Sequence, residues 1–326
     1  MSQPSVFDPS QHRIAVLGGG VMGPGIAQVF AEHGFQVDLC DIRDEAVARG
    51  MATLRESIQL KVELGLTPAA DAAAILARVA PHVGIDIALP RARLVVEAIS
   101  ENREAKSALY RRIDEICAPD TVVWSNTSTL NVFELASDTL RPRLVVAHWF
   151  APPHILPLVE VVGGEDTSPS TVDDCVTALR ALGKVPVRLK KFVPGFVINR
   201  LQRALGHEAF HLIQSGVIDV EELDAAVRTS LAPRMQIVGL MQRYDFTGLN
   251  LSQRNLEDRA IVDAPADLAP APLVERVARG ELGVSTGKGF YDYSGRSTLE
   301  MQRLRDAALW RVVDGLGELV SDPRPL

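Results

Sequence analysis

The chain has 326 residues, of which 47% are hydrophobic and 23% charged, a balance typical of globular proteins and unlike that of disordered or fibrous ones. This length favours two domains over a single core. The formal net charge of -7 argues against nucleic acid or an anionic membrane surface as a partner.

The N-terminal segment and the cysteines bear on the compartment. Residues 1–11 are polar and have neither the basic start nor the apolar run of a secretory signal. No apolar run approaches the roughly 20 residues that cross a bilayer. Cys40, Cys117 and Cys175 are scattered without metal-ligand spacing, which suits a reducing compartment. We expect a cytoplasmic protein with no metal site and a small-molecule substrate.

The first predicted elements form a strand, a glycine turn, a helix and a second strand. Residues 13–17 are apolar and predict a buried strand, residues 18–23 are rich in glycine, and residues 26–32 have helical spacing. Residues 36–40 alternate in polarity and predict the next strand, with Asp41 at its end. This order is that of a βαβ unit.

The glycine turn matches the GxGxxG pattern of dinucleotide-binding proteins. Gly18 permits the sharp turn, Gly20 lets backbone approach a pyrophosphate, and Gly23 lets the helix pack on the strand. Asp41 can accept hydrogen bonds from ribose hydroxyls, which favours NAD over NADP, although the nearby Arg43 could accommodate a 2′-phosphate. The sequence predicts NAD as cofactor; the alternative is a glycine-rich turn beside a solvated aspartate.

Strands and helices continue to alternate as far as residue 189. The pattern predicts helices over 45–66, 69–79, 103–117 and 170–182, and strands over 94–98, 121–124, 144–148, 158–162 and 185–189. Such alternation indicates an α/β fold with a doubly wound, mostly parallel sheet of Rossmann type. We therefore predict a dinucleotide-binding domain over residues 1–190.

Helical periodicity dominates beyond Pro194 and Gly195. Helices are predicted over 196–215, 220–230 and 234–242, and strand-like runs largely vanish. The sequence thus predicts a second, all-helical domain over residues 191–326.

His148 and Glu160 are the first candidates for catalysis. His148 ends a predicted strand, and Glu160 lies inside an apolar strand where burial of a carboxylate requires a partner. If the two strands pair, the carboxylate can orient the imidazole, which could then take the proton of an alcohol as hydride leaves. The alternative is a structural histidine and a solvent-facing glutamate.

Two polar segments are further candidates. Residues 125–128 (Ser-Asn-Thr-Ser) follow a strand at the carboxyl edge of the predicted sheet, where open α/β sheets bind ligands. They could instead cap a helix over 130–135. Asn199 and Arg200 open a predicted helix of the second domain, and they too could be capping residues.

These residues together resemble the 3-hydroxyacyl-CoA dehydrogenase family over nearly the whole chain. The matching segments are GGGVMG (18–23), VVEAISEN (95–102), SNTSTL (125–130), HWFAPPHILPLVEVV (148–162), VPGFVINR (193–200) and TGKGFYDY (286–293). The resemblance implies a dehydrogenase with NAD as cofactor that dimerises through its helical domain. It also implies that His148 is the general base, that Glu160 is its partner, and that Ser128 and Asn199 hold the reacting oxygen.

The resemblance implies cofactor contacts as well. They fall on Gly18, Gly20, Met22, Gly23, Asp41, Ala98, Glu101, Lys106 and Asn126, to which the glycine turn and the ribose edge add Val21 and Arg43. One departure stands out: Ala151 replaces the asparagine that the family usually has three residues after its histidine.

The charges favour a free acid as substrate over a CoA ester. The family binds CoA with helices that correspond to residues 51–79, where three basic and three acidic residues cancel. Arg234 could clamp a carboxylate in the second domain, as in the family's free-acid branch, which includes L-gulonate 3-dehydrogenase and carnitine dehydrogenase. Alternatively, Arg234 is a surface residue at a helix start. His154 could line the pocket or be solvated.

We therefore expect an NAD-dependent dehydrogenase that acts on a small 3-hydroxy acid. Two alternatives remain at this point. One is an L-3-hydroxyacyl-CoA dehydrogenase acting on a CoA thioester. The other, of a different class, is a catalytically silent NAD-binding structural protein.

Overall fold

The computed structural model describes residues 7–317 and 319, and they divide into two compact units. One unit holds the described residues up to Val197 together with those from Arg305 onward, and the other holds Ile198–Leu304. No helix among the described residues combines the length and apolar character needed to cross a membrane.

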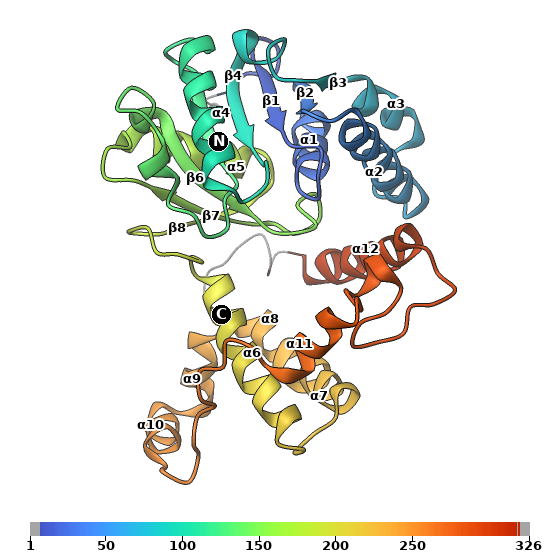
Figure 1. The fold of residues 1–326 in the computed structure, drawn as a ribbon, viewed down its shortest axis with the longest axis vertical. Coiled ribbons are helices and arrows are strands. Elements are labelled where there is room, and N and C mark those ends of the chain that lie inside the picture. The colour runs from blue at the N-terminus through green and yellow to red at the C-terminus, as the bar shows by residue number, and fades with distance from the viewer. Residues whose placement is uncertain (1–6, 318, 320–326) are drawn as a thin grey trace. The chain divides into compact units, whose positions relative to one another are not determined.

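The first unit is built on an eight-stranded sheet with the order β3-β2-β1-β4-β5-β6-β7-β8 (Figure 1). All neighbours are parallel except β6 and β7, so the predicted mostly parallel, doubly wound sheet is confirmed. The strands are β1 (Arg13–Leu17), β2 (Gln36–Asp41), β3 (Val79–Val83), β4 (Ala92–Glu97), β5 (Val122–Ser125), β6 (Leu144–Trp149), β7 (Leu158–Gly163) and β8 (Val185–Arg188).

Strand β3 is absent from the sequence prediction, which places a helix over 69–79 and nothing regular after it. The strand contains Pro81 and His82, and it pairs only with β2 at the edge of the sheet. An edge strand tolerates proline because one side of its backbone needs no partner strand. Its side chains are partly exposed, so it lacks the apolar run that marks the buried strands.

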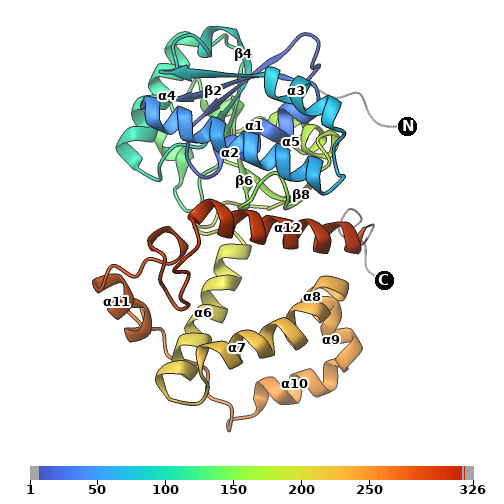
Figure 2. The same cartoon turned by 90° about the vertical axis from the view of Figure 1, so that its right-hand side faces the viewer.

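Helices cover both faces of this sheet. Helices α1 (Gly23–Glu32), α2 (Asp44–Glu63) and α5 (Pro169–Ala181) pack on one face, and α4 (Arg103–Ile116) packs on the other (Figure 2). The short α3 (Ala69–Ala77) follows α2. Helix α1 shows why the pattern works: Ile26, Val29 and Phe30 are three or four residues apart, so all three face the core. The sheet thus has a continuous apolar layer on each side.

The antiparallel turn from β6 to β7 positions the candidate catalytic pair. A parallel crossover needs roughly a dozen residues or more, and the connection over residues 150–157 is shorter. The chain therefore reverses directly, and His148 comes to lie opposite Glu160 in the ladder.

The second unit is helical, as predicted. It contains α6 (Ile198–Gln214), α7 (Val220–Ala226), a π-helical turn over Val227–Leu231, α8 (Ala232–Val238), α9 (Met241–Thr247), α10 (Leu249–Glu257) and α11 (Ala271–Ala278). Helix α12 (Thr298–Leu316) begins in this unit and ends in the first. The single helix predicted over 234–242 is wrong: Gly239 has a φ of 64° and separates α8 from α9.

The second unit has almost no interior of its own. Among residues 198–304 only Ser252 and Pro270 are buried. Many large apolar side chains are open to solvent, including Met241 at 72%, Phe246 at 70% and Leu256 at 81% exposure.

Candidate active site

A cavity of about 850 Å³ opens beside the glycine turn that joins β1 to α1. The cofactor candidates that line it are Gly18, Gly20, Val21, Met22, Asp41, Arg43 and Ala98. The apolar part of the cavity wall includes Ile42, Ile85 and Leu109. Small, apolar and acidic groups in one hollow are what a dinucleotide needs for its pyrophosphate, adenine ring and ribose.

The structure shows why glycine is present at three positions of the turn. Gly18 has a φ of 118°, and a Cβ there would collide with the Ala98 carbonyl. A Cβ on Gly23 would collide with the Gly18 carbonyl. Gly20 has open space above it, so a pyrophosphate could approach its backbone. No side chain caps the N-terminus of α1, whose free N–H groups favour an anion, so the turn fits NAD.

Asp41 is held in place at the end of β2. Its Oδ2 accepts a hydrogen bond from the Gly19 amide at 2.9 Å, and its Oδ1 accepts one from the Arg43 amide at 3.1 Å. The carboxylate therefore ties the ribose edge of the cavity to the glycine turn. The Arg43 side chain is largely exposed.

His148 and Glu160 form a buried pair. His148 Nδ1 lies 2.9 Å from Glu160 Oε2, and the two side chains are 6% and 1% exposed. The other carboxylate oxygen, Oε1, accepts a hydrogen bond from the Val197 amide at 3.0 Å. With the proton on Nδ1 donated to Glu160, Nε2 is the nitrogen that can accept a proton.

Two aromatic rings hold the imidazole. The rings of Phe150 and Phe196 lie 4.5 and 5.2 Å from that of His148, measured between centroids. Phe196 has a φ of 48°, a strained value for a bulky residue, and is 1% exposed. Sequence reasoning missed Phe196, whose strained backbone leaves no signal in the residue pattern.

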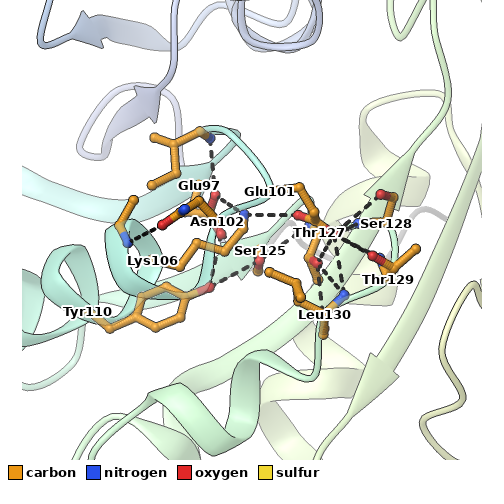
Figure 3. Close-up of polar contacts among 12 residues, drawn as sticks. Glu97, Glu101, Asn102, Lys106, Tyr110, Ser125, Thr127, Ser128, Thr129 and Leu130 are labelled. Carbon is orange, nitrogen blue, oxygen red and sulfur yellow. Dashed lines mark hydrogen bonds and ion pairs between the residues drawn. The ribbon is translucent and has the colours of Figure 1, made fainter.

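The carboxylate of Glu101 accepts hydrogen bonds from the loop that follows β5 (Figure 3). Its Oε1 accepts hydrogen bonds from the backbone amides of Ser128 and Thr129 and from the Thr127 hydroxyl, at 2.9, 2.8 and 2.7 Å. Burial alone would raise the pKa of Glu101, but these hydrogen bonds and the nearby Lys106 charge outweigh it and lower the pKa to about 2. The polar loop thus binds a carboxylate, and its 3-10 turn begins only at Val132.

Behind this loop lies a fully buried ion pair between Lys106, a predicted cofactor contact, and Glu97, which sequence reasoning did not single out. Lys106 Nζ is 2.6 Å from Glu97 Oε1 and 3.5 Å from Glu101 Oε2, and Lys106 is 1% exposed. Glu97 Oε2 also accepts from the hydroxyls of Tyr110 and Ser125 at 2.9 and 2.6 Å. Lys106 therefore lies behind Glu101 and not among the residues that line the cavity.

Asn126 joins three neighbouring strands. Its backbone N–H donates to the Glu97 carbonyl of β4 at 2.8 Å, and its side-chain Oδ1 accepts from the backbone N–H of Trp149 in β6 at 2.8 Å. These bonds hold the end of β5 between the strands on either side.

The remaining predicted site residues belong to the second unit. Asn199 lies in the first turn of α6. Arg234 lies in α8, where its guanidinium donates to the Ser230 carbonyl at 3.0 Å and to the Ser230 hydroxyl at 3.1 Å. The structure thus brings His148 and Glu160 together and binds Ser128 to Glu101, and it describes Asn199 and Arg234 within a separate unit.

His154 is neither solvated nor on the wall of the dinucleotide cavity. Its side chain is 7% exposed, and neither ring nitrogen has a hydrogen-bond partner among the described residues. Burial, followed by the charges of Lys184 and Lys61, lowers its pKa to about 3. His154 is therefore neutral at physiological pH.

Two family models match nearly the whole chain. The NAD binding domain of 3-hydroxyacyl-CoA dehydrogenase matches residues 13–192, and the C-terminal domain of the same enzymes matches residues 195–293.

Similar proteins include enzymes for free acids and for CoA esters. A 5-formyl-3-hydroxy-2-methylpyridine 4-carboxylate 5-dehydrogenase of Mesorhizobium japonicum is 35% identical, over 93% of this chain and 98% of the relative. A probable 3-hydroxybutyryl-CoA dehydrogenase of Bacillus subtilis is 33% identical (88% and 99%), and an L-carnitine dehydrogenase of Burkholderia mallei is 31% identical (92% and 92%). A solved structure of the pyridine carboxylic acid dehydrogenase, an NAD⁺-dependent dismutase, superposes with a TM-score of 0.83 at 34% identity (94% and 98%).

Proposed function

Because this chain belongs to the 3-hydroxyacyl-CoA dehydrogenase family and is an NAD-dependent dehydrogenase acting on CH–OH donors, we propose that its substrate is a small 3-hydroxy acid and that His148, oriented by Glu160, is its general base. The observation that carries this proposal is the 2.9 Å contact between the buried imidazole and carboxylate. The same residues would serve the reverse reaction, reduction of the keto acid.

The proposed chemistry assigns one proton to the histidine. NAD would be held by the glycine turn and, when bound, would supply the acceptor for the hydride of the substrate carbon. His148 Nε2 takes the hydroxyl proton as the hydride leaves, and the ring becomes an imidazolium. Glu160 stabilises that cation through Nδ1, and the buried, aromatic surroundings of the ring strengthen the interaction. Ser128 and Asn199 hold the reacting oxygen in this proposal.

The cofactor contacts are part of the same proposal. The glycine turn binds the pyrophosphate and Asp41 binds the adenosine ribose, which favours NAD over NADP. Glu101, Lys106 and Asn126 order the nicotinamide end of the site. The full set is Gly18, Gly20, Val21, Met22, Gly23, Asp41, Arg43, Ala98, Glu101, Lys106 and Asn126.

Basic side chains that are already paired within the protein support a free acid over a CoA ester as the substrate. The family's CoA-binding helices correspond to residues 51–79, where Lys61 lies 2.7 Å from Glu32 and 5.2 Å from the centre of the Trp310 ring. Arg78 donates to the Ala31 carbonyl at 3.1 Å. Two of the three basic residues in this stretch are thus occupied within the protein, which leaves little charge for the phosphates of CoA.

Arg234 would bind the carboxylate of the substrate. Its guanidinium can form a bidentate pair with a carboxylate, and its present partner, Ser230, is neutral and can yield to a charged one. The names of two relatives support this choice, because a pyridine 4-carboxylate and L-carnitine are both free acids. The alternative is a CoA thioester, as the name of the Bacillus subtilis relative implies for that protein.

We also propose a homodimer in the cytoplasm, with residues 1–190 binding NAD and residues 191–326 binding substrate and the second copy. The second unit exposes apolar side chains that a second copy would cover. The net charge of -7 gives no reason to expect nucleic acid as a partner.

Turnover of His148 and Glu160 variants tests the proposed chemistry. The absorbance of NADH is followed with a panel of 3-hydroxy acids and with 3-hydroxybutyryl-CoA. We expect His148→Ala to lower kcat by about 10²–10⁴-fold and Glu160→Gln by about 10²-fold, because the base or its orienting partner is lost. Glu165→Gln, an exposed neighbour on the loop after β7, is the matched control. Unchanged turnover in His148→Ala would contradict the assignment.

Arg234→Ala separates the two substrate classes. On the best free acid we expect a loss of about 10–100-fold in kcat/KM, mostly through KM, because the clamp contributes to binding. A CoA ester should be turned over poorly by the native chain. Higher kcat/KM on the CoA ester than on every acid would replace the proposal with the thioester alternative.

A further inference from the structure

The turn that joins β6 to β7 packs against the first turn of α1, the helix that follows the glycine turn. A Cβ on Gly25 would lie 2.7 Å from Cγ of Pro153 and 3.0 Å from Nδ1 of His154. Both distances are shorter than the 3.4–4 Å of ordinary van der Waals contact, so any larger side chain at Gly25 would displace the turn or the helix. The backbone of Gly25 has no positive φ, so close packing is what requires glycine here.

The turn is held together so that it moves as one body. The Pro152 carbonyl accepts hydrogen bonds from the amides of Ile155 and Leu156 at 3.1 and 3.0 Å. The buried Lys184 ammonium donates to the carbonyls of Pro153 and Leu156 at 2.7 and 3.1 Å. The two proline rings fix their own φ angles as well. A displacement of Pro153 is therefore passed to the ends of the turn, because the turn itself has little freedom to absorb it.

Both ends of the turn lead to the catalytic pair. At one end, the ring of Phe150 lies 4.5 Å from that of His148, measured between centroids. Trp149, between these two residues in the chain, has its ring 5.3 Å from the Lys184 ammonium. At the other end, the chain enters β7, which carries Glu160. The position of the turn on α1 thus affects the imidazole and the carboxylate together.

The contact at Gly25 lies apart from the surface that would bind NAD. Among the described residues, the wall of the 850 Å³ cavity includes Gly18, Gly20 and Met22 but not Gly25 or Pro153. A methyl group at Gly25 would therefore point at the turn and not into the cavity. Alanine also favours a helix more than glycine does, so the substitution does not weaken α1 itself.

We infer that Gly25 is a positioning residue: the space that it leaves for Pro153 and His154 lets the turn between the catalytic strands pack directly on α1, which fixes His148 relative to the glycine turn. The inference rests on the proposed function for the role of His148, whereas the packing of the turn does not depend on it. One contact thus places the base and the cofactor-binding helix with respect to each other.

Gly25→Ala tests the inference by three readouts. The added methyl group forces Pro153 and His154 away from α1, and we expect kcat to fall by about 10–100-fold because the base is misplaced. The Kd for NADH, measured by fluorescence titration, should change by less than about threefold, because the cavity wall keeps its residues. Hydrogen exchange of the Ile155 and Leu156 amides within the turn should accelerate by about tenfold or more.

A second substitution shows whether the ring of Pro153 transmits the effect. In Gly25→Ala combined with Pro153→Ala, the two closest contacts of the new methyl group with that ring disappear. We expect kcat of the double variant to exceed that of Gly25→Ala by about threefold or more, although Pro153→Ala alone should not raise kcat. Gly315→Ala is the matched control, because a Cβ at this glycine of α12 meets no atom within 4 Å, and it should leave all three readouts unchanged.

Unchanged kcat or unchanged exchange in Gly25→Ala would overturn the inference. A rise of about tenfold in the Kd for NADH with kcat unaffected would overturn it too, since the helix would then have moved in place of the turn. The double variant must recover part of kcat and, should Gly25→Ala not fold, must itself fold for the inference to hold. Absence of turnover by the native chain on any substrate would count against the proposed function, and the exchange measurement would still decide whether Gly25 places the turn.

Discussion

Phe30 and Trp124 of the first unit are each at most 1% exposed, whereas Phe246 and Leu256 of the second are 70% and 81% exposed. The first unit buries its apolar residues between a sheet and helices on both faces. The second has amphipathic helices whose apolar sides lack a cover within the described chain. The comparison teaches that one unit buries its apolar residues by its own packing, whereas the other exposes apolar side chains that the proposed second copy would cover.

Removal of a core side chain from the first unit should have the largest effect. Trp124 lies in β5 and contacts the rings of Phe7 and Phe30. Trp124→Ala should lower the free energy of unfolding by about 3–5 kcal/mol, since it leaves a large cavity. Urea unfolding at several protein concentrations measures this. Val83→Ala, at a side chain 56% exposed, is the control, and a similar loss there would remove the contrast between core and surface.

Acid should weaken the first unit through His154. Burial lowers the pKa of this histidine from 6.5 to about 3, so its neutral form stabilises the fold fully above pH 6.5. That stability is lost as the pH falls from 6.5 toward 3, because the unfolded chain binds the proton more readily. Between pH 6.5 and 4.5 the loss is about 2 kcal/mol.

The comparison of native chain and His154→Gln isolates this effect. Glutamine does not titrate, so the drop in unfolding free energy between pH 7 and 4.5 should be smaller in the variant by about 2 kcal/mol. Equal acid sensitivity in both proteins would mean that His154 is protonated or solvated in the fold.

A substitution on the second unit should change assembly more than the fold of a single copy. Phe246→Ser should alter the stability of an isolated copy by no more than about 0.5 kcal/mol, since the ring is 70% exposed. It should weaken the dimer about tenfold, seen by sedimentation equilibrium, because a partner would bury the ring.

Ile87→Ser is the matched substitution on the first unit, where the side chain is 60% exposed. It should leave the dissociation constant unchanged. If the native chain sediments as a monomer at every concentration, a second copy is not what covers the second unit.

Local patterns were enough to predict the glycine turn and most elements of the sheet. Gly18, Gly20 and Gly23 are required by backbone geometry over a few residues, and the helix of residues 26–32 is marked by its own spacing. The edge strand over Val79–Val83 escaped prediction because its burial depends on one neighbour only. The break at Gly239 escaped because helical spacing continues across it.

The sequence by itself determined which chemical groups are available: a glycine turn, a strand-end histidine, a glutamate in an apolar strand and a polar loop. Only the tertiary structure decided which of them meet. Glu97, Lys106 and Glu101 come from different elements, and their contacts depend on the packing of α4 beside β4. Contacts of this kind follow from the register and distance of packed elements, which residue spacing does not contain, whereas the reversal between β6 and β7 follows from the length of one connection.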